Sequence, residues 1–151
     1  MFEIQLGTGG GENIGARHAV PLQSPPAPSL YLLDLPGYGY ARASKGELTA
    51  FRGLLNHVVK RPRLVGVVWL LDIRRDPSAE DQAMKDTFAA GGTRVLAALT
   101  KSDKLPRGQR LARAAALRET LGVAADQMII TSARTGEGIP ELREAVAAIV
   151  A

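Results

Sequence analysis

Three short motifs hold side chains and glycines that could act on a nucleotide, and each follows an apolar run directly. The motifs are Asp34-Leu35-Pro36-Gly37, Thr100-Lys101-Ser102-Asp103 and Thr131-Ser132-Ala133. Wholly apolar runs such as residues 30–33 predict strands that are buried on both faces. The motifs are therefore expected at the carboxyl ends of strands, along one rim of a parallel sheet, where α/β proteins bind their ligands.

The first motif could meet a phosphate and its metal ion. The carboxylate of Asp34 can serve Mg²⁺, and the turn at Gly37 brings a backbone N–H close to a phosphate oxygen. On this stretch alone, the alternative is a plain strand-to-helix corner in which Asp34 caps the next element.

The second and third motifs together could recognise guanine. A fixed carboxylate at Asp103 could accept two parallel hydrogen bonds from N1–H and the 2-amino group of guanine, a donor pair that adenine lacks. The stem of Lys101 could lie along the base, and the backbone N–H of Ala133 could bond guanine O6. Three motifs in this order, each at a strand end, indicate a guanine nucleotide site.

The composition is that of an ordinary globular protein. The 151 residues suffice for one hydrophobic core, with 46% hydrophobic and 23% charged residues. No apolar run is long enough for a bilayer and no signal peptide is recognisable, so we expect no membrane partner and a cytoplasmic location. The absence of cysteine excludes disulfides, thiolate metal sites and cysteine nucleophiles.

The net charge of +4 mildly favours a polyanionic partner such as RNA. A solvated basic surface is the alternative. Few aromatic residues lie among the basic clusters, so stacking on bases is not indicated. We expect no DNA partner.

Strands alternate with helices along the chain, which predicts a parallel sheet covered on both faces, in a single domain over residues 1–151. Strands are expected at 2–6, 30–33, 65–73, 94–100 and 127–131, and helices at 45–61, 78–90, 107–121 and 139–150. Residues 7–28 are expected to form an extended hairpin loop. Within it, residues 10–17 keep two glycines of a phosphate-binding loop, but Ala16 and Arg17 replace the Lys and Ser/Thr that this chemistry needs.

At this point the chain resembles a known family. DLPGYGYA at residues 34–41, GVVWLLDIR at 66–74 and LTKSDKL at 99–105 resemble GTPases of the EngB type, also called YihA or YsxC. That bacterial family is linked to large ribosomal subunit assembly and to cell division and septation. The resemblance covers residue 29 to the C-terminus and implies a three-layer, P-loop-GTPase-like α/β fold.

The resemblance also implies roles for the three motifs. Asp34 would orient Mg²⁺ through water, and the Gly37 N–H would face the γ-phosphate of GTP. Lys101 and Asp103 would hold guanine, with Thr131-Ser132-Ala133 beside it. Tyr38 stands where many translation-factor GTPases have their catalytic residue, and EngB-type proteins resemble the sequence in this too. A tyrosine cannot orient water as Gln does, so we name no catalytic residue and expect any hydrolysis to be slow unless a partner or an ion assists.

The sequence departs from the family at its start. It resembles the family with the N-terminal part removed: the first strand, the GxxxxGKS loop, the first helix and a Thr ligand of Mg²⁺ are missing. We therefore expect weak or absent GTP binding. We also expect a marginally stable protein, since the strands that end at Asp34 and Asp72 must pair directly or keep open edges.

Three functional hypotheses remain at this stage. The first is a truncated EngB-type GTPase whose full form binds GTP and GDP and assists the large ribosomal subunit. The second is a degenerate, non-enzymatic GTPase that binds the ribosome or rRNA through its basic surface. The third is another doubly wound nucleotide or phosphate enzyme, which would require the motifs to be coincidences.

Overall fold

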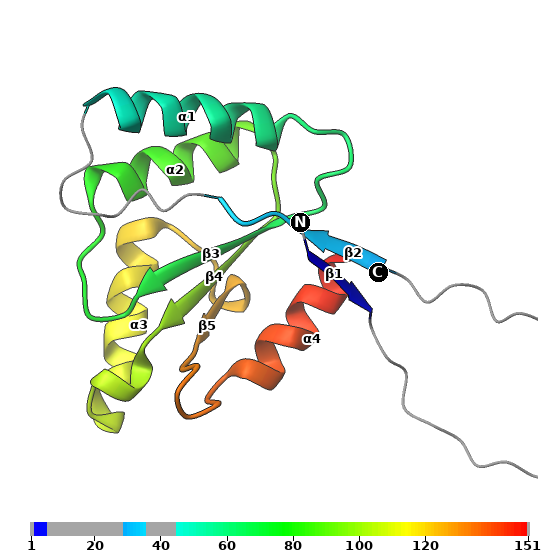
Figure 1. Ribbon diagram of the computed structural model, residues 1–151. Coiled ribbons are helices and arrows are strands. Elements are labelled where there is room, and N and C mark those ends of the chain that lie inside the picture. The colour runs from blue at the N-terminus through cyan, green and yellow to red at the C-terminus, as the bar shows by residue number, and fades with distance from the viewer. Residues whose placement is uncertain (1, 6–28, 36–44, 151) are drawn as a thin grey trace, which may run out of the picture. The chain divides into compact units, whose positions relative to one another are not determined.

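A computed structural model describes residues 2–5, 29–35 and 45–150, and the chain divides into two compact units. The first unit, Met1–Pro36, holds one hairpin, and the second, Gly37–Ala151, holds the remaining elements (Figure 1). The single domain expected over residues 1–151 stays a prediction. The loop expected at 7–28 lies outside the described residues.

The hairpin of the first unit pairs β1 (Phe2–Gln5) with β2 (Ser29–Leu32) in antiparallel register. Tyr31, Leu32 and Leu33 are 62%, 42% and 48% exposed. The prediction that residues 30–33 are buried on both faces is therefore wrong. The described part of β2 pairs with β1 alone, so its apolar composition reflects strand propensity and not burial within this unit.

The second unit is built on a parallel sheet in the order β3 (Val67–Asp72), β4 (Val95–Thr100) and β5 (Met128–Ile130). The central strand carries the core, since the four residues 96–99 are at most 3% exposed. Successive side chains of a strand point to opposite faces, so β4 is covered on both sides. This is the burial that its wholly apolar sequence predicts.

Four helices cover this sheet: α1 (Lys45–Val59), α2 (Ala79–Ala90), α3 (Arg107–Leu121) and α4 (Ile139–Val150). The connection from β3 to β4 carries α2, the connection from β4 to β5 carries α3, and α4 follows β5 (Figure 1). Phe88 of α2 packs edge-on against Trp69 of β3, with ring centroids 5.8 Å apart.

The ends of two helices follow their local sequence. At α2, Ser78 accepts a hydrogen bond from the Asp81 N–H and the Asp81 carboxylate accepts one from the Ser78 N–H, which is a complete capping box. At α3, Gly122 adopts the left-handed conformation (φ 62°) that commonly ends a helix.

The structure confirms every helix and strand predicted from the sequence, with shifts of a few residues at several ends. Two 3₁₀ turns were not foreseen, Ser102–Lys104 and Ala125–Gln127. Among the described residues, β2 pairs with β1 in the first unit and β3 pairs with β4 in the second. No helix in the described ranges is long and apolar enough to cross a membrane.

Candidate functional site

The parallel register brings the ends of β3, β4 and β5 together at one edge of the sheet. Asp72, the last residue of β3, lies opposite Thr100, the last residue of β4. The Ser102 N–H then donates to the Thr131 carbonyl oxygen at 3.1 Å, which joins the loop after β4 to the loop after β5. The second and third sequence motifs therefore meet, as their strand-end positions predict.

Lys101 is the turning point of the loop after β4. Its φ of 62° makes it the one non-glycine residue with positive φ in the described ranges. The left-handed conformation costs a residue with a side chain about 1–2 kcal/mol. Such strain persists where surrounding contacts impose it, and it concentrates at functional sites. Here the hydrogen bonds of Ser102 and Lys104 to neighbouring carbonyls hold the turn.

Asp103 presents a carboxylate with one oxygen bound and one oxygen open. Oδ1 accepts a hydrogen bond from the Ser132 hydroxyl at 2.7 Å. Oδ2 is buried and has no hydrogen-bond donor among the described residues, and the side chain is only 10% exposed. The Ser132 hydrogen bond, helped by the cations of Lys104 and Arg134 at 3.7 Å, holds the pKa of Asp103 below its ordinary value. Oδ2 of the ionised Asp103 can therefore accept a further hydrogen bond.

The loop after β5 supplies a matching donor. The Ser132 N–H bonds the Glu137 carbonyl oxygen at 2.9 Å, which closes the turn over residues 132–137. The next residue, Ala133, is exposed, and its N–H has no partner in the part of the chain that the structure describes. A carboxylate oxygen and a free N–H thus lie on adjoining loops, which is the arrangement expected for a base with both donor and acceptor groups.

The two threonines of these motifs use their hydroxyls to hydrogen-bond the backbone of neighbouring strands. Thr100 donates from Oγ1 to the Leu71 carbonyl oxygen at 3.0 Å. Thr131 is buried, and its Oγ1 lies 3.3 Å from the Leu99 carbonyl oxygen. Both side chains therefore fix the ends of neighbouring strands.

Asp72 joins the site as a residue that the sequence did not single out. It accepts a bidentate pair from Arg74, at 2.9 and 2.7 Å, and its Oδ2 lies 3.1 Å from the Lys101 ammonium. The Arg74 hydrogen bonds, with help from Lys101, hold the pKa of Asp72 well below its ordinary range. This carboxylate therefore holds the Lys101 side chain toward the end of β3. The feature of the sequence that could have indicated Asp72 is an acidic residue at the end of a buried strand.

Glu137 was predicted only as part of a loop, yet it contacts three parts of the site. Its Oε2 accepts hydrogen bonds from the Ser102 hydroxyl at 2.5 Å and from Arg110 at 2.7 Å. The Ser102 hydrogen bond, followed by Arg110, holds the pKa of Glu137 below its ordinary value. No local sequence pattern announces this, since Ser102 and Glu137 are 35 residues apart.

The first sequence motif lies at the boundary of the two units, since residues 34–36 belong to the first and Gly37 begins the second. Asp34 is exposed just beyond β2, Leu35 is half-buried, and Pro36 and Gly37 lie outside the described residues. In the described ranges no three His, Cys, Asp or Glu side chains are grouped to hold a metal ion. One carboxylate does not make a resident Mg²⁺ site, so no chemical step is assigned to a metal here.

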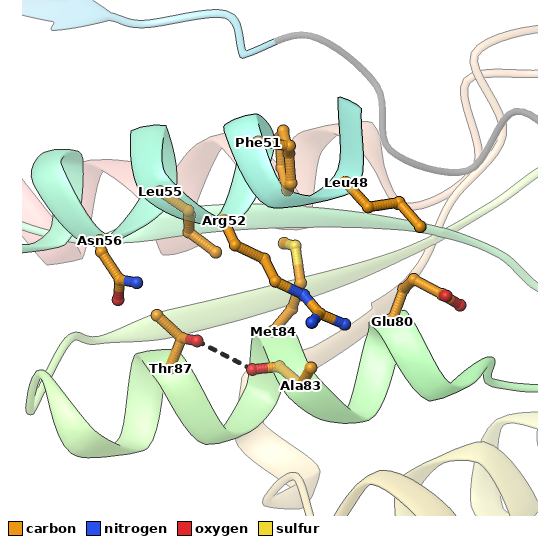
Figure 2. Close-up of a pocket in the computed structure, with 9 residues that line it drawn as sticks. All are labelled: Leu48, Phe51, Arg52, Leu55, Asn56, Glu80, Ala83, Met84 and Thr87. Atoms are coloured by element: carbon orange, nitrogen blue, oxygen red, sulfur yellow. Dashed lines mark hydrogen bonds between the residues drawn. The ribbon is translucent and has the colours of Figure 1, made fainter. Parts of the chain in front are cut away.

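A cavity between α1 and α2 is a separate feature of this unit (Figure 2). Its volume is about 80 Å³, and its lining combines apolar side chains with the polar side chains of Arg52, Asn56, Glu80 and Thr87. Small-molecule sites commonly measure about 300–1,000 Å³. None of the described residues predicted for the site lines it, so it is separate from the loops after β4 and β5.

The sequence of the chain is similar to those of probable GTP-binding proteins. It is 46% identical over 121 residues to the "Probable GTP-binding protein EngB" of Gemmatimonas aurantiaca, a match that covers 80% of this chain and 59% of the relative. The protein of the same name from Syntrophomonas wolfei is 39% identical over 121 residues, with 80% and 62% covered. The chain thus spans about three fifths of the length of these relatives. No family model matches it.

A solved structure agrees with the fold. A crystal structure of a probable GTP-binding protein engB superposes with a TM-score of 0.64 at 18% sequence identity, over 78% of this chain and 76% of that chain. At this identity the likeness concerns the fold. It confirms the predicted class, a mostly parallel α/β sheet with helices of the P-loop GTPase type.

Proposed function

Because the chain belongs to the EngB family of GTP-binding proteins over its aligned residues, we propose that it binds guanine nucleotides through the loops after β4 and β5. In this assignment Asp103 accepts from N1–H and the 2-amino group of guanine. The Ala133 N–H donates to O6, and the Lys101 stem covers one face of the base.

The observation that carries this proposal is the open oxygen of Asp103. A buried carboxylate oxygen without a donor is costly, and native proteins rarely keep one without a functional reason. Oδ1 already has Ser132 and could share a second donor, whereas Oδ2 has no hydrogen bond and only the cations of Lys104 and Arg134 at 3.7 Å. A ligand edge with two adjacent N–H donors, as guanine has and adenine lacks, would satisfy both oxygens.

The phosphate side of the site is proposed on family grounds alone. Asp34 would contact nucleotide-bound Mg²⁺ through water and the Gly37 N–H would face the γ-phosphate. The sequence offers no GxxxxGKS loop, and phosphate contacts supply much of the affinity in such sites. We therefore expect this chain to bind GDP and GTP weakly, with dissociation constants of about a millimolar, and to hydrolyse GTP slowly at most.

A titration followed by ¹H–¹⁵N NMR tests guanine binding even when affinity is low. We expect GDP to shift the amide signals of residues 101–103 and 132–133 in a saturable way. ADP is the matched control, because it has the same phosphates and ribose but the wrong base edge. Equal shifts of these amides with GDP and ADP would contradict the proposal.

The family resemblance further supports a role in large ribosomal subunit assembly, and through it in cell division and septation, within the cytoplasm. The chain's own support is its net charge of +4 and the exposed side chains of Lys60, Arg61 and Arg63 after α1. Co-sedimentation with purified large subunits tests this. We expect binding that weakens with salt and with the double substitution Arg61→Ala and Arg63→Ala, and binding indifferent to both would contradict it.

A second candidate is a non-enzymatic module that binds rRNA or the ribosome. The sequence feature that favours it is the lack of a GxxxxGKS loop in the given residues, since the partial match at residues 10–17 has neither the Lys nor the Ser/Thr that phosphate and metal binding need. Nucleotide dependence separates the two. A GTPase should bind the large subunit differently with GTP and GDP, whereas the module should bind it equally with or without nucleotide.

A further inference from the structure

We propose that Glu137 is a positioning residue that sets how Asp103 meets the guanine base. It does so by clamping the loop after β5 onto the loop after β4. This inference rests on the proposed guanine binding and extends it to a residue outside the motifs that predict the site. Glu137 is not assigned a contact with the nucleotide.

The clamp uses both the main chain and the side chain of Glu137. Its carbonyl oxygen accepts from the Ser132 N–H at 2.9 Å, so it shapes the turn that carries Ser132. Its carboxylate accepts from the Ser102 hydroxyl at 2.5 Å and from Arg110 of α3 at 2.7 Å. One residue therefore joins the loop after β5, the loop after β4 and the helix that follows.

Ser102 is the link to the base-binding residues, because it stands between Lys101 and Asp103 in the chain. It is fully buried, at 0% exposed, and its N–H is bound to the Thr131 carbonyl oxygen. Without Glu137 its hydroxyl would lose its acceptor in a buried place, which a protein relieves by shifting the chain or admitting water. Either change would move the flanking Asp103.

The next residue fixes where Glu137 stands. Gly138 has φ 68°, and a Cβ built on it would lie 2.0 Å from the Ile130 carbonyl oxygen. The turn is therefore pressed against the end of β5. The main chain next to Glu137 is thereby held at the end of β5, and its carboxylate reaches Ser102 from this fixed backbone.

Base selectivity reports this positioning directly. IDP differs from GDP only in lacking the 2-amino group, which is one of the two donors that Asp103 accepts. The affinity ratio of GDP to IDP in the wild-type chain therefore measures how well Asp103 is aligned. A general loss of folding would lower both affinities and leave that ratio unchanged.

The experiment compares GDP and IDP by NMR titration for the wild-type chain, Glu137→Ala, Glu137→Gln and Ser102→Ala. We expect Glu137→Ala to lower GDP affinity about tenfold and to bring the GDP to IDP ratio close to one. Glu137→Gln keeps an acceptor for Ser102 and should recover most of the ratio. Glu144→Ala, an exposed change on α4, should leave the ratio at its wild-type value.

A double substitution separates a shared link from independent effects. Combining Ser102→Ala with Glu137→Ala should lower the ratio no further than Glu137→Ala alone, since both remove the same hydrogen bond. If Glu137→Ala folds and keeps the wild-type ratio, the positioning role is overturned and guanine binding stays intact. If Glu137→Ala does not fold, a wild-type ratio in both single variants, Glu137→Gln and Ser102→Ala, has the same meaning. A wild-type chain without preference for GDP over IDP and ADP would overturn both.

Discussion

Three carboxylates stand around the loop after β4, and their partners assign them different roles. Asp72 is bound by Arg74 and Lys101, and Glu137 is bound by Ser102 and Arg110. Asp103 alone keeps a buried oxygen without a donor in the described ranges. The first two are occupied in holding the loop, whereas this oxygen of Asp103 has only the cations of Lys104 and Arg134 at 3.7 Å.

The low pKa of Asp72 predicts a pH dependence of stability. A carboxylate whose pKa is depressed by folding stabilises the native state fully above its unfolded value, about 3.9, and loses this contribution as pH falls toward its folded value. We expect Asp72→Asn to be clearly destabilising at pH 7 and less so at pH 3, because part of the contribution is lost once the pH is below the unfolded pKa. Urea unfolding at both values measures this, and an equal difference at both would contradict the assigned ion pair.

For single residues, the sequence could predict only those site residues that lie next to one another in the chain. Lys101 and Asp103 were predicted as site residues because they share one tetrapeptide at a strand end, and the structure places them together. Glu137 and Arg110 gave no such signal. Their contacts join residues 27 and 35 positions apart, and such pairs are created by the fold and not by a local pattern.

At the scale of elements, short loops between regular elements position the site. The bounds of α3 and α4 follow from helical periodicity, from Pro140 at the start of α4 and from Gly122 at the end of α3. The 3₁₀ turn Ser102–Lys104 could not be predicted, because the left-handed Lys101 that precedes it is imposed by neighbouring strands. The exposure of β2 was not predicted, because an apolar sequence indicates a strand but does not show which elements pack against its two faces.

The turn that carries Glu137 yields a prediction about stability. Gly138→Ala adds a Cβ that would lie 2.0 Å from the Ile130 carbonyl oxygen, on a backbone with φ 68°. We expect it to lower the free energy of unfolding by at least about 2 kcal/mol. Gly136→Ala is the matched control: φ is 80°, but no atom lies within 4 Å, so it should cost only about 1–2 kcal/mol. Chemical unfolding of both variants decides, and equal costs would refute the close packing at Gly138.

At the scale of the whole molecule, the chain spans about three fifths of its relatives' length, and its parallel sheet leaves apolar surface uncovered. In the described ranges β3 has only β4 as a partner, and Leu70 on β3 is 65% exposed. Burial of apolar area is the main favourable term in folding. We therefore predict that the chain has a low free energy of unfolding.

Thermal unfolding tests that expectation. We expect a broad transition at low temperature for the wild-type chain, and a cooperative transition at high temperature would contradict it. Two substitutions add a local check. Leu99→Ala, at a fully buried position of β4, should cost about 2–5 kcal/mol, whereas Leu70→Ala should cost under about 1 kcal/mol.

The measurement that tests guanine recognition most directly is a comparison of GDP with XDP in the wild-type chain and in Asp103→Asn. Xanthine carries an oxygen where guanine has its 2-amino group, so an Asn amide, one donor and one acceptor, fits xanthine as a carboxylate fits guanine. We predict that the wild-type chain prefers GDP and that Asp103→Asn prefers XDP, by about tenfold or more in each direction. If the substitution leaves the preference unchanged, Asp103 does not read the base.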